Sequence, residues 1–237
     1  VFNEGSHHAL RMGLSDDFKF RRNTLTHQQI LYRMAELEYE GDGYRLTVPR
    51  AAREEAHGLL GQLGVPRDRL LVGLNTGCGP VFETKAWNVD GYVELARMIS
   101  EKTNAAMLLL GGPRERDVHE AIMEKAGMLA GSRLFDTGNT NPLERFFALV
   151  ERCDVLLSSD SLAMHVGIAL EKHVVAFFGP TCEQEVDLFG RGEKIVTDYE
   201  CSPCYLKRCD VRPSCMQAMT AESVFEAIGR QLEMAGK

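Results

Sequence analysis

Residues 154–181, DVLLSSDSLAMHVGIALEKHVVAFFGPT, decide the fold of this chain. Val155–Leu157 is a continuous apolar run, as expected for a strand buried on both faces of a parallel sheet. Val174–Phe178 repeats this pattern after one short helical segment, and Gly179-Pro180-Thr181 ends the second run. The stretch therefore predicts a strand, a polar turn, a short helix and a second strand, which is a βαβ unit.

The turn inside this unit carries polar side chains where a ligand is expected. Ser158-Ser159-Asp160-Ser161 follows the first strand, and open α/β sheets bind ligands at the carboxyl ends of their strands. The next helix presents free N–H groups and the positive end of its dipole there, which suits a phosphate. His165 lies about one helical turn beyond Asp160, so we expect both on one face. The alternative, that Ser161 only caps the helix and His165 is a core histidine, stays open.

Composition limits the class of protein. The 237 residues, 44% hydrophobic and 26% charged, fit one large domain or one domain plus part of another. A net charge of −7 and a pI near 5.6 argue against a nucleic-acid-binding protein. No uninterrupted apolar run approaches the ~18 residues of a membrane span, and no signal peptide is visible, so we expect a cytoplasmic protein. Because the chain begins with Val1 rather than Met, we also expect a missing piece upstream.

The first 64 residues show weak patterning. We predict a helix over 27–38, an extended segment over 44–48 and a helix over 50–63 that Pro49 introduces. We interpret this region as a connection between domains, because regular alternation of strands and helices begins only after it.

A regular rhythm follows from Leu70. Strands are predicted at 70–74, 105–110 and 133–135, and helices at 89–102, 115–128, 143–152 and 221–232. This alternation predicts a doubly wound, mostly parallel, Rossmann-like α/β sheet over 65–237. The apolar stripe that includes Leu143 and Phe146 has helical spacing, and we interpret it as core packing rather than as a cofactor contact.

Two further strand ends resemble parts of a ligand crevice. In Leu74–Pro80 the glycine-rich turn indicates that Thr76 and backbone amides hold phosphate oxygens, with Lys85 supplying a positive charge. The spacing is not that of a Walker loop. After the next strand, Glu115 is placed to accept hydrogen bonds from a ribose, although taken alone it reads better as an ordinary first-turn residue of a helix.

Five motifs in order carry a specific resemblance. NTG…TKAW, LLGGPRE, NTNPLE, SSDSLAMH and FFGPT resemble the C-terminal half of glycosyltransferase family 9, the ADP-heptose:lipopolysaccharide heptosyltransferases and their relatives, over roughly 65–237. The resemblance implies a GT-B fold of two Rossmann-like domains, of which the C-terminal one holds the nucleotide-sugar donor. It makes residues 1–64 the remnant of an N-terminal acceptor domain and the linker between the domains.

The resemblance also implies a donor site. Lys85 and Thr76 would contact the phosphates or the sugar, Glu115 the ribose, Asp160 the sugar hydroxyls and the turn amides of 161–163 the pyrophosphate. Leu162 stands where many members have glycine. The expected donor-binding residues are Thr76, Gly77, Lys85, Glu115, Asn141 at the adenine-side wall, Asp160, Ser161, Leu162, Ala163 and His165, which closes the site.

The implied activity is inverting transfer of a sugar, heptose from ADP-heptose, to lipopolysaccharide or another envelope glycan, at the cytoplasmic face of the inner membrane with peripheral contact. The resemblance places the catalytic base, a carboxylate, in the N-terminal domain and implies no catalytic metal. A non-catalytic nucleotide-sugar-binding or interaction module is the alternative. The upstream reading frame distinguishes the two, since the enzyme needs about a hundred further residues with a strand-end Asp.

A cysteine cluster is the remaining signal. Cys201, Cys204, Cys209 and Cys215 lie within fifteen residues, in CSPCYLKRCDVRPSC over 201–215. In a cytosolic protein such clustering favours metal ligation over disulfides, and four thiolates suit a structural zinc ion. An iron site, disulfides and free thiols stay open as alternatives. The spacing also resembles the cysteine-rich loop of many family 9 members.

Overall fold

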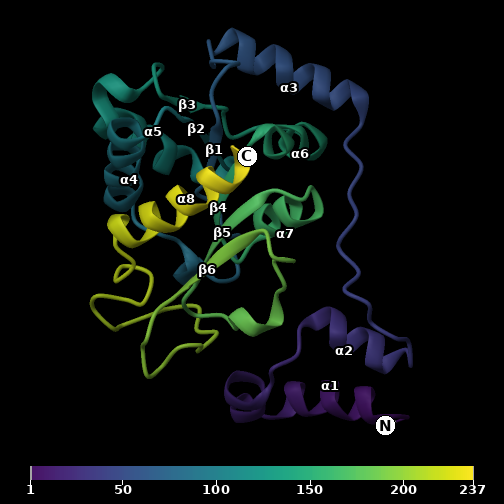
Figure 1. The fold of residues 1–237 in the computed structure, drawn as a ribbon. Helices are drawn as coiled ribbons and strands as arrows, with labels where there is room; N and C mark the ends of the chain where they lie inside the picture. The colour runs from purple at the N-terminus through teal and green to yellow at the C-terminus, as the bar shows by residue number, and fades with distance from the viewer. Residues whose placement is uncertain (1, 237) are drawn as a thin grey trace.

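The computed structural model describes residues 2–236 and contains a six-stranded sheet whose neighbouring strands are all parallel. The strand order is β3-β2-β1-β4-β5-β6 (Figure 1). The order reverses between β1 and β4, which makes their carboxyl ends a topological switch point. The strands are β1 (Leu71–Asn75), β2 (Ala106–Leu110), β3 (Leu134–Asp136), β4 (Val155–Ser159), β5 (His173–Phe178) and β6 (Gly192–Val196).

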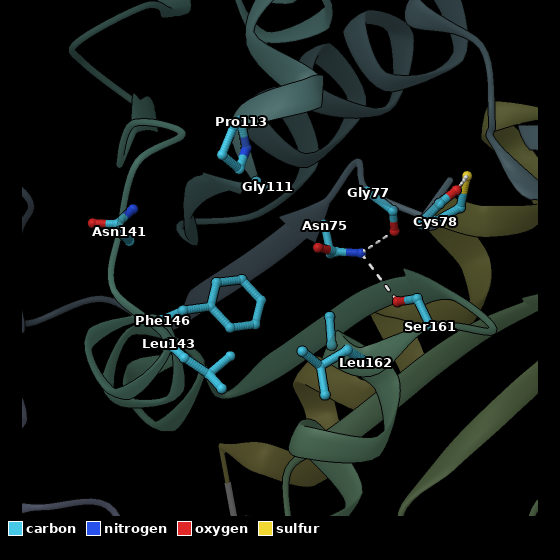
Figure 2. Close-up of a pocket in the computed structure, with 13 residues that line it drawn as sticks. Asn75, Gly77, Cys78, Gly111, Pro113, Asn141, Leu143, Phe146, Ser161 and Leu162 are labelled. Carbon is cyan, nitrogen blue, oxygen red and sulfur yellow. Dashed lines mark hydrogen bonds between the residues drawn. The ribbon is translucent and has the colours of Figure 1, made fainter. Parts of the chain in front are cut away.

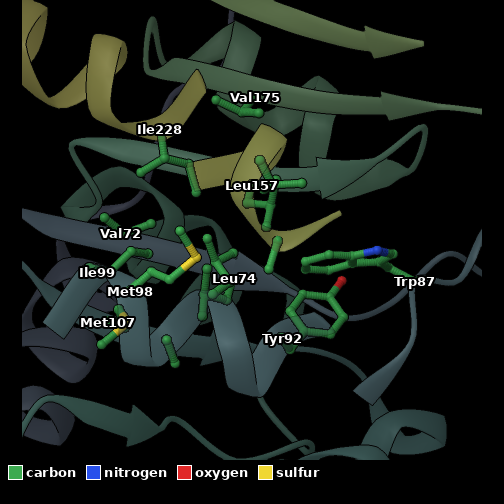
Figure 3. Packing of buried hydrophobic residues seen from close by; sticks show 14 of the residues in the cluster. Val72, Leu74, Trp87, Tyr92, Met98, Ile99, Met107, Leu157, Val175 and Ile228 are labelled. Carbon is green, nitrogen blue, oxygen red and sulfur yellow. The ribbon is translucent and has the colours of Figure 1, made fainter. Parts of the chain in front are cut away.

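Helices cover both faces of the sheet. One face carries α4 (Val89–Lys102), α5 (Arg116–Ala126) and α8 (Ala221–Ala235), and the other carries α3 (Arg50–Gln62), α6 (Leu143–Arg152) and α7 (Leu162–Ala169). Successive strand residues point to opposite faces, so Leu157 packs under the first layer (Figure 3) and Leu156 under the second. The predicted Rossmann-like, doubly wound sheet is confirmed.

The start of α4 is anchored to the end of β1. Asn88 caps the helix, with its Oδ1 accepting a hydrogen bond from the Gly91 amide at 2.7 Å. The Tyr92 hydroxyl donates to the Asn75 carbonyl at 2.9 Å, and the Trp87 indole donates to the Met219 carbonyl at 3.0 Å. Both rings belong to the buried cluster of Figure 3, so this core reaches the rim of the switch point.

The N-terminal region contains more helix than the sequence predicted. α1 (Glu4–Leu14) and a π-helical turn at Phe18–Arg22 were not predicted, and α2 (His27–Met34) ends before residue 38, because Glu36 adopts a positive φ of 56°. An extended segment then leads to α3 (Figure 1). Within residues 2–236, none of the helices combines the length and the apolar character needed to cross a membrane.

A buried carboxylate attaches this N-terminal segment to the sheet domain. Glu185, which is 6% exposed, lies after β5 and accepts hydrogen bonds from the Tyr205 hydroxyl at 2.9 Å and from His27 Nε2 at 3.1 Å. Its other oxygen lies 3.9 Å from Lys19 Nζ. Phe20 stacks on the Tyr205 ring with centroids 5.3 Å apart. Two residues of the N-terminal segment thus neutralise one buried charge.

The charges of this contact depend on pH. The hydrogen bond to Glu185 raises the pKa of His27 above 6.5. Burial opposes ionisation of Glu185, but the hydrogen bonds and charges of His27, Tyr205 and Lys19 outweigh it and lower the pKa of this carboxyl below 4.5. The stabilisation from His27 is complete below pH 6.5 and is lost as pH rises through its raised pKa. That from Glu185 is lost as pH falls through its lowered pKa, so the contact is strongest between the two.

We therefore expect His27→Gln to lower the free energy of unfolding near pH 6 and to have less effect at pH 8.5. The loss should not exceed about 1 kcal/mol, because His27 is 60% exposed and solvent screens the pair. Urea unfolding at both pH values measures it. His57→Gln, on the exposed side of α3, is the matched control and should show no such difference. An equal effect of His27→Gln at both pH values would contradict the ion pair.

Candidate functional site

A cavity of about 340 Å³ opens at the switch point, between the carboxyl ends of β1, β2 and β4 and the first turns of α6 and α7 (Figure 2). Open α/β sheets bind their ligands at this position. Its lining residues are Asn75, Gly77, Cys78, Gly79, Gly111, Gly112, Pro113, Asn141, Leu143, Phe146, Ser161, Leu162 and Ala163.

Asn75 holds the two central strand ends together. Its side-chain amide donates to the Gly77 carbonyl at 2.7 Å and to Ser158 Oγ, at the end of β4, at 3.1 Å. Asn75 is 4% exposed, and Figure 2 shows its side-chain amide between Gly77 and Ser161. Asn75 was not among the residues predicted for the site. A buried amide at the end of a strand must find hydrogen-bond partners, and it can fix the loops on both sides by doing so.

One side of the cavity is formed by glycine backbone. An added Cβ at Gly77 would lie 3.2 Å from the carboxyl carbon of Glu115, and one at Gly111 would lie 2.8 Å from His119 Nε2. The Glu115 carboxylate accepts a hydrogen bond from the Gly112 amide at 2.8 Å. At Gly77 and Gly111 a side chain has no room, so backbone groups line the cavity there, as in sites that bind phosphate through amides.

The opposite side is apolar. Phe146 and Leu143, from the first turn of α6, converge with Leu162 on the cavity (Figure 2), and Leu143 and Leu162 are each 55% exposed. Our interpretation of Leu143 and Phe146 as core packing alone was wrong. Phe146 packs partly against the core and also lines the cavity, because the helical stripe turns toward the strand ends at the start of α6.

The start of α7 is not capped by a serine hydroxyl. Ser161 occupies the N-cap position, but its side chain makes no capping hydrogen bond among the described residues and instead lies 2.9 Å from Ser158 Oγ. Ser161, Leu162 and Ala163 all line the cavity. The first amides of α7 and the positive end of its dipole are therefore available to an anion, and the capping-only reading of Ser161 is wrong.

Lys85 and Asp160 form a pair at the edge of this region. Lys85 Nζ donates to the Asp160 carbonyl and lies 3.7 Å from the Asp160 carboxylate, and both residues are largely buried. His165 is half-buried, with its ring 5.8 Å from that of Tyr44. Burial, helped by the nearby cations His27 and Lys85, lowers the pKa of His165 despite the opposing charge of Asp160. None of these three residues lines the cavity itself.

Of the other predicted residues, Glu115 does not line the cavity, and its carboxylate is held at the Gly112 amide behind it. Gly77, Asn141, Ser161, Leu162 and Ala163 meet in the cavity, where Asn141 holds its loop by donating to the Thr137 carbonyl at 3.0 Å and the Gly138 carbonyl at 2.9 Å. Thr76 is turned away from it, since its hydroxyl lies 3.0 Å from His119 Nε2 beneath Gly111. Its expected contact with a phosphate is not supported by this orientation.

The cysteine-rich loop lies on a different surface. Cys204, Cys209 and Cys215 line one concavity together with Lys207 and Arg212, whereas Cys201 is exposed. Burial, and then the charges of the other three thiolates, raise the pKa of Cys215. Among residues 2–236, no three His, Cys, Asp or Glu side chains converge closely enough to hold a metal ion. The zinc site therefore stays a prediction.

Comparisons with known proteins show which family and which fold this chain is similar to. A family model described as glycosyltransferase family 9 (heptosyltransferase) matches residues 20–214. The lipooligosaccharide heptosyltransferase 2 of Campylobacter jejuni is 23% identical over 165 residues, which cover 67% of this chain and 50% of that protein. The chain thus spans about half the length of the curated relatives it matches first.

Two solved structures share the fold. A family 9 glycosyltransferase from Veillonella parvula superposes with a TM-score of 0.73 at 18% identity, over 91% of this chain and 62% of that one. The heptosyltransferase II of E. coli superposes with a TM-score of 0.63 at 18% identity, over 81% and 54% of the two chains.

The close packing beneath the cavity leads to a prediction. Gly111→Ala should lower the free energy of unfolding by about 1–3 kcal/mol, because the new methyl group would be forced against the His119 ring. Chemical denaturation measures it. Gly58→Ala, on α3, is the matched control, since an added Cβ there would meet no neighbouring group within 4 Å. This substitution should stabilise the protein by up to about 1 kcal/mol, because alanine favours the helix. Equal effects of the two substitutions would show that the loop has room.

Proposed function

The chain belongs to glycosyltransferase family 9, and from this premise we propose that its cavity binds the nucleoside diphosphate of a nucleotide sugar, with ADP-heptose as the expected donor. The observation that carries the proposal is the contrast between the two sides of the cavity. Leu143 and Phe146 offer an apolar wall to a base, while the glycine backbone and the start of α7 offer amides to a diphosphate.

The proposed reaction is attack of an acceptor hydroxyl on the anomeric carbon, while the nucleoside diphosphate departs with the bonding electron pair. A general base takes the proton of the hydroxyl. The backbone amides at the start of α7 and the Lys85 ammonium group would stabilise the charge that develops on the leaving diphosphate. Asp160, which the ammonium group already contacts, would bind hydroxyl groups of the sugar.

The acceptor is proposed at the class level. Lipopolysaccharide or a related envelope glycan is the expected acceptor, and the cytoplasmic face of the inner membrane the expected location. The family match supports transfer to a glycan, whereas peripheral contact with a membrane stays a prediction. A non-catalytic nucleotide-sugar-binding module would share the cavity but not the reaction, so an assay for sugar transfer by the complete protein separates the two.

Calorimetric titration of the chain with ADP and ADP-heptose tests the donor site. We expect weak binding, and Lys85→Met and Asp160→Asn should each weaken binding of ADP-heptose by roughly 1–3 kcal/mol, the scale of a hydrogen bond to a charged group. Asp160→Asn should weaken ADP less than ADP-heptose, because its proposed contact is to the sugar.

The exposed ion pair of Lys125 and Asp90, whose side chains lie 2.6 Å apart on the surface, supplies the control. Lys125→Met should leave both affinities unchanged. Absence of binding by any of ADP, UDP and GDP at millimolar concentration would overturn the proposed function, and wild-type affinities in both site variants would overturn the roles of Lys85 and Asp160.

We also propose that the four loop cysteines hold one structural zinc ion. Three of the thiols already border one concavity, and the Cys204 and Tyr205 amides fix the loop by donating to the Pro180 carbonyl at 3.0 and 2.8 Å. Thiolates are the ligands that structural zinc sites use. The loop joins β6 to α8, so metal binding can tighten it without rearranging the sheet.

We expect about one zinc ion per chain in protein purified under reducing conditions, measured by elemental analysis. Cys209→Ser should release the metal and lower stability modestly. Cys153→Ser is the matched control, because Cys153 is buried at the C-terminal end of α6, far along the chain from the loop, and the substitution should retain the metal. A metal content below roughly 0.2 ion per chain, with the loop thiols free to react in the folded protein, would contradict the zinc site. It would indicate a loop with reduced cysteines that is held by packing alone.

A further inference from the structure

The side-chain amide of Asn75 uses its nitrogen to hold the loops but leaves its oxygen free. The nitrogen donates to the Gly77 carbonyl at 2.7 Å and to Ser158 Oγ at 3.1 Å. A carbonyl can only accept a hydrogen bond, so the nitrogen must face Gly77, and this fixes the oxygen on the other side of the group. Among residues 2–236, no group donates a hydrogen bond to that oxygen.

The free oxygen faces the cavity. Asn75 lines the cavity and is almost fully buried. Figure 2 shows its oxygen pointing away from Gly77 and Ser161, toward the side of the cavity where the Phe146 ring lies. A largely buried acceptor is normally paired, because an unpaired one has lost hydration without a replacement. The oxygen is therefore available to a ligand that can donate a hydrogen bond.

The chemistry of this oxygen selects the part of the ligand that it contacts. A side-chain amide oxygen has lone pairs and no proton, so it can only accept a hydrogen bond. The ionised oxygens of a diphosphate are also acceptors, and two acceptors repel each other. A hydroxyl group, which has a proton to donate, is the complementary partner. We therefore expect a hydroxyl of the ligand, and not a phosphate, to lie over Asn75.

The position of Asn75 identifies that hydroxyl. The apolar wall of Leu143 and Phe146 lies on one side of it, and Ser161, at the start of α7, lies on the other, with its Oγ 3.4 Å from the Asn75 nitrogen. In a nucleoside diphosphate the ribose joins the base to the phosphates. A ligand with its base on the apolar wall and its phosphates at the start of α7 therefore brings its ribose to Asn75.

Other polar side chains near the cavity already have partners. Asn141 donates to two carbonyls of its own loop, and its Oδ1 accepts a hydrogen bond from Arg145 Nε at 2.8 Å. The Ser161 hydroxyl is paired with another serine hydroxyl at 2.9 Å. Glu115, which the sequence predicted for the ribose, does not line the cavity, and one of its carboxylate oxygens is held by a backbone amide. Of these four side chains, Asn75 is the one that offers an unpaired oxygen in the lining.

We propose that Asn75 Oδ1 accepts a hydrogen bond from a ribose hydroxyl of the bound nucleoside diphosphate and so makes the site selective for ribonucleotides. The inference rests on the proposed function, because it needs the nucleotide in this cavity. One side-chain amide then has two roles, since its nitrogen holds the loops and its oxygen contacts the ribose. A nucleotide without that hydroxyl leaves the oxygen unpaired, and an unpaired buried group is what allows a site to reject an analogue that lacks a hydroxyl.

Calorimetric titration of the wild-type chain with ADP, 2′-deoxy-ADP and 3′-deoxy-ADP tests this contact without a variant. We expect at least one deoxy nucleotide to bind roughly 3- to 30-fold more weakly than ADP. The fluoro analogue at that position should bind as weakly, because fluorine cannot donate a hydrogen bond. The amino analogue retains an N–H donor and should bind nearly as well as ADP. Equal affinities for ADP and both deoxy nucleotides would overturn the inference while leaving the proposed function intact.

Two variants then test whether Asn75 makes the contact. In Asn75→Ala, ADP should bind more weakly and the discrimination against the deoxy nucleotide should disappear, because the acceptor is gone. Ser158→Ala is the matched control, since it removes a partner of the Asn75 nitrogen but keeps the Asn75 oxygen. This variant should retain the wild-type ratio of the affinities for ADP and the deoxy nucleotide.

Discrimination that persists in Asn75→Ala would place the hydroxyl at another acceptor, such as the Glu115 carboxylate, and would overturn the inference. If Asn75→Ala does not fold, nuclear magnetic resonance of the wild type with labelled asparagine side chains replaces it. The side-chain carbonyl signal of Asn75 should shift more with ADP than with the deoxy nucleotide, and equal shifts would overturn the inference. If the wild type binds none of ADP, UDP and GDP, the proposed function fails and this inference fails with it.

Discussion

The side-chain amide of Asn75 is the interaction on which the site depends. A parallel sheet brings the ends of β1 and β4 side by side but does not determine how the loops after them are spaced. Asn75 determines this spacing, because it donates both to the Gly77 carbonyl and to Ser158 of β4, while its own carbonyl is held by Tyr92. The cavity keeps its shape because these buried hydrogen bonds hold the two loops at a fixed spacing.

The cavity is lined by few charged side chains. Backbone groups of the loops after β1 and β2 and of the start of α7 line its polar side, and Lys85 at its edge is already paired with Asp160. Amides held in place by the fold need no reorganisation when an anion binds, whereas a free lysine would have to lose side-chain entropy. The buried His119 and Asp136 extend this arrangement below the surface, since they brace the same loops from beneath.

The N-terminal segment reaches the same end of the sheet. Lys19 and His27 meet Glu185 after β5, and Tyr44 of the extended segment contacts His165. Because His165 lies on α7, which begins just after Asp160, this segment borders the Lys85–Asp160 region as well as the loop around Tyr205. Residues far apart in the chain thus surround one edge of the site, and the carboxylate of Glu185 holds them there at neutral pH.

The sequence by itself determined the order and type of the elements in the sheet domain, because buried parallel strands and amphipathic helices leave apolar patterns that depend only on local spacing. It also predicted five residues that meet in the cavity, since polar and glycine residues after such strands must lie at one edge of the sheet. β6 was missed, because an edge strand that is only partly buried carries no continuous apolar run.

Only the tertiary structure decided which way side chains face. Thr76 turns inward to His119, 43 residues away, and Phe146 lines the cavity as well as packing against the core. The bond between Asn75 and Ser158 spans 83 residues. Periodicity reports which face of its own element a residue occupies, but contacts between elements depend on how the layers pack, and no local pattern records that packing.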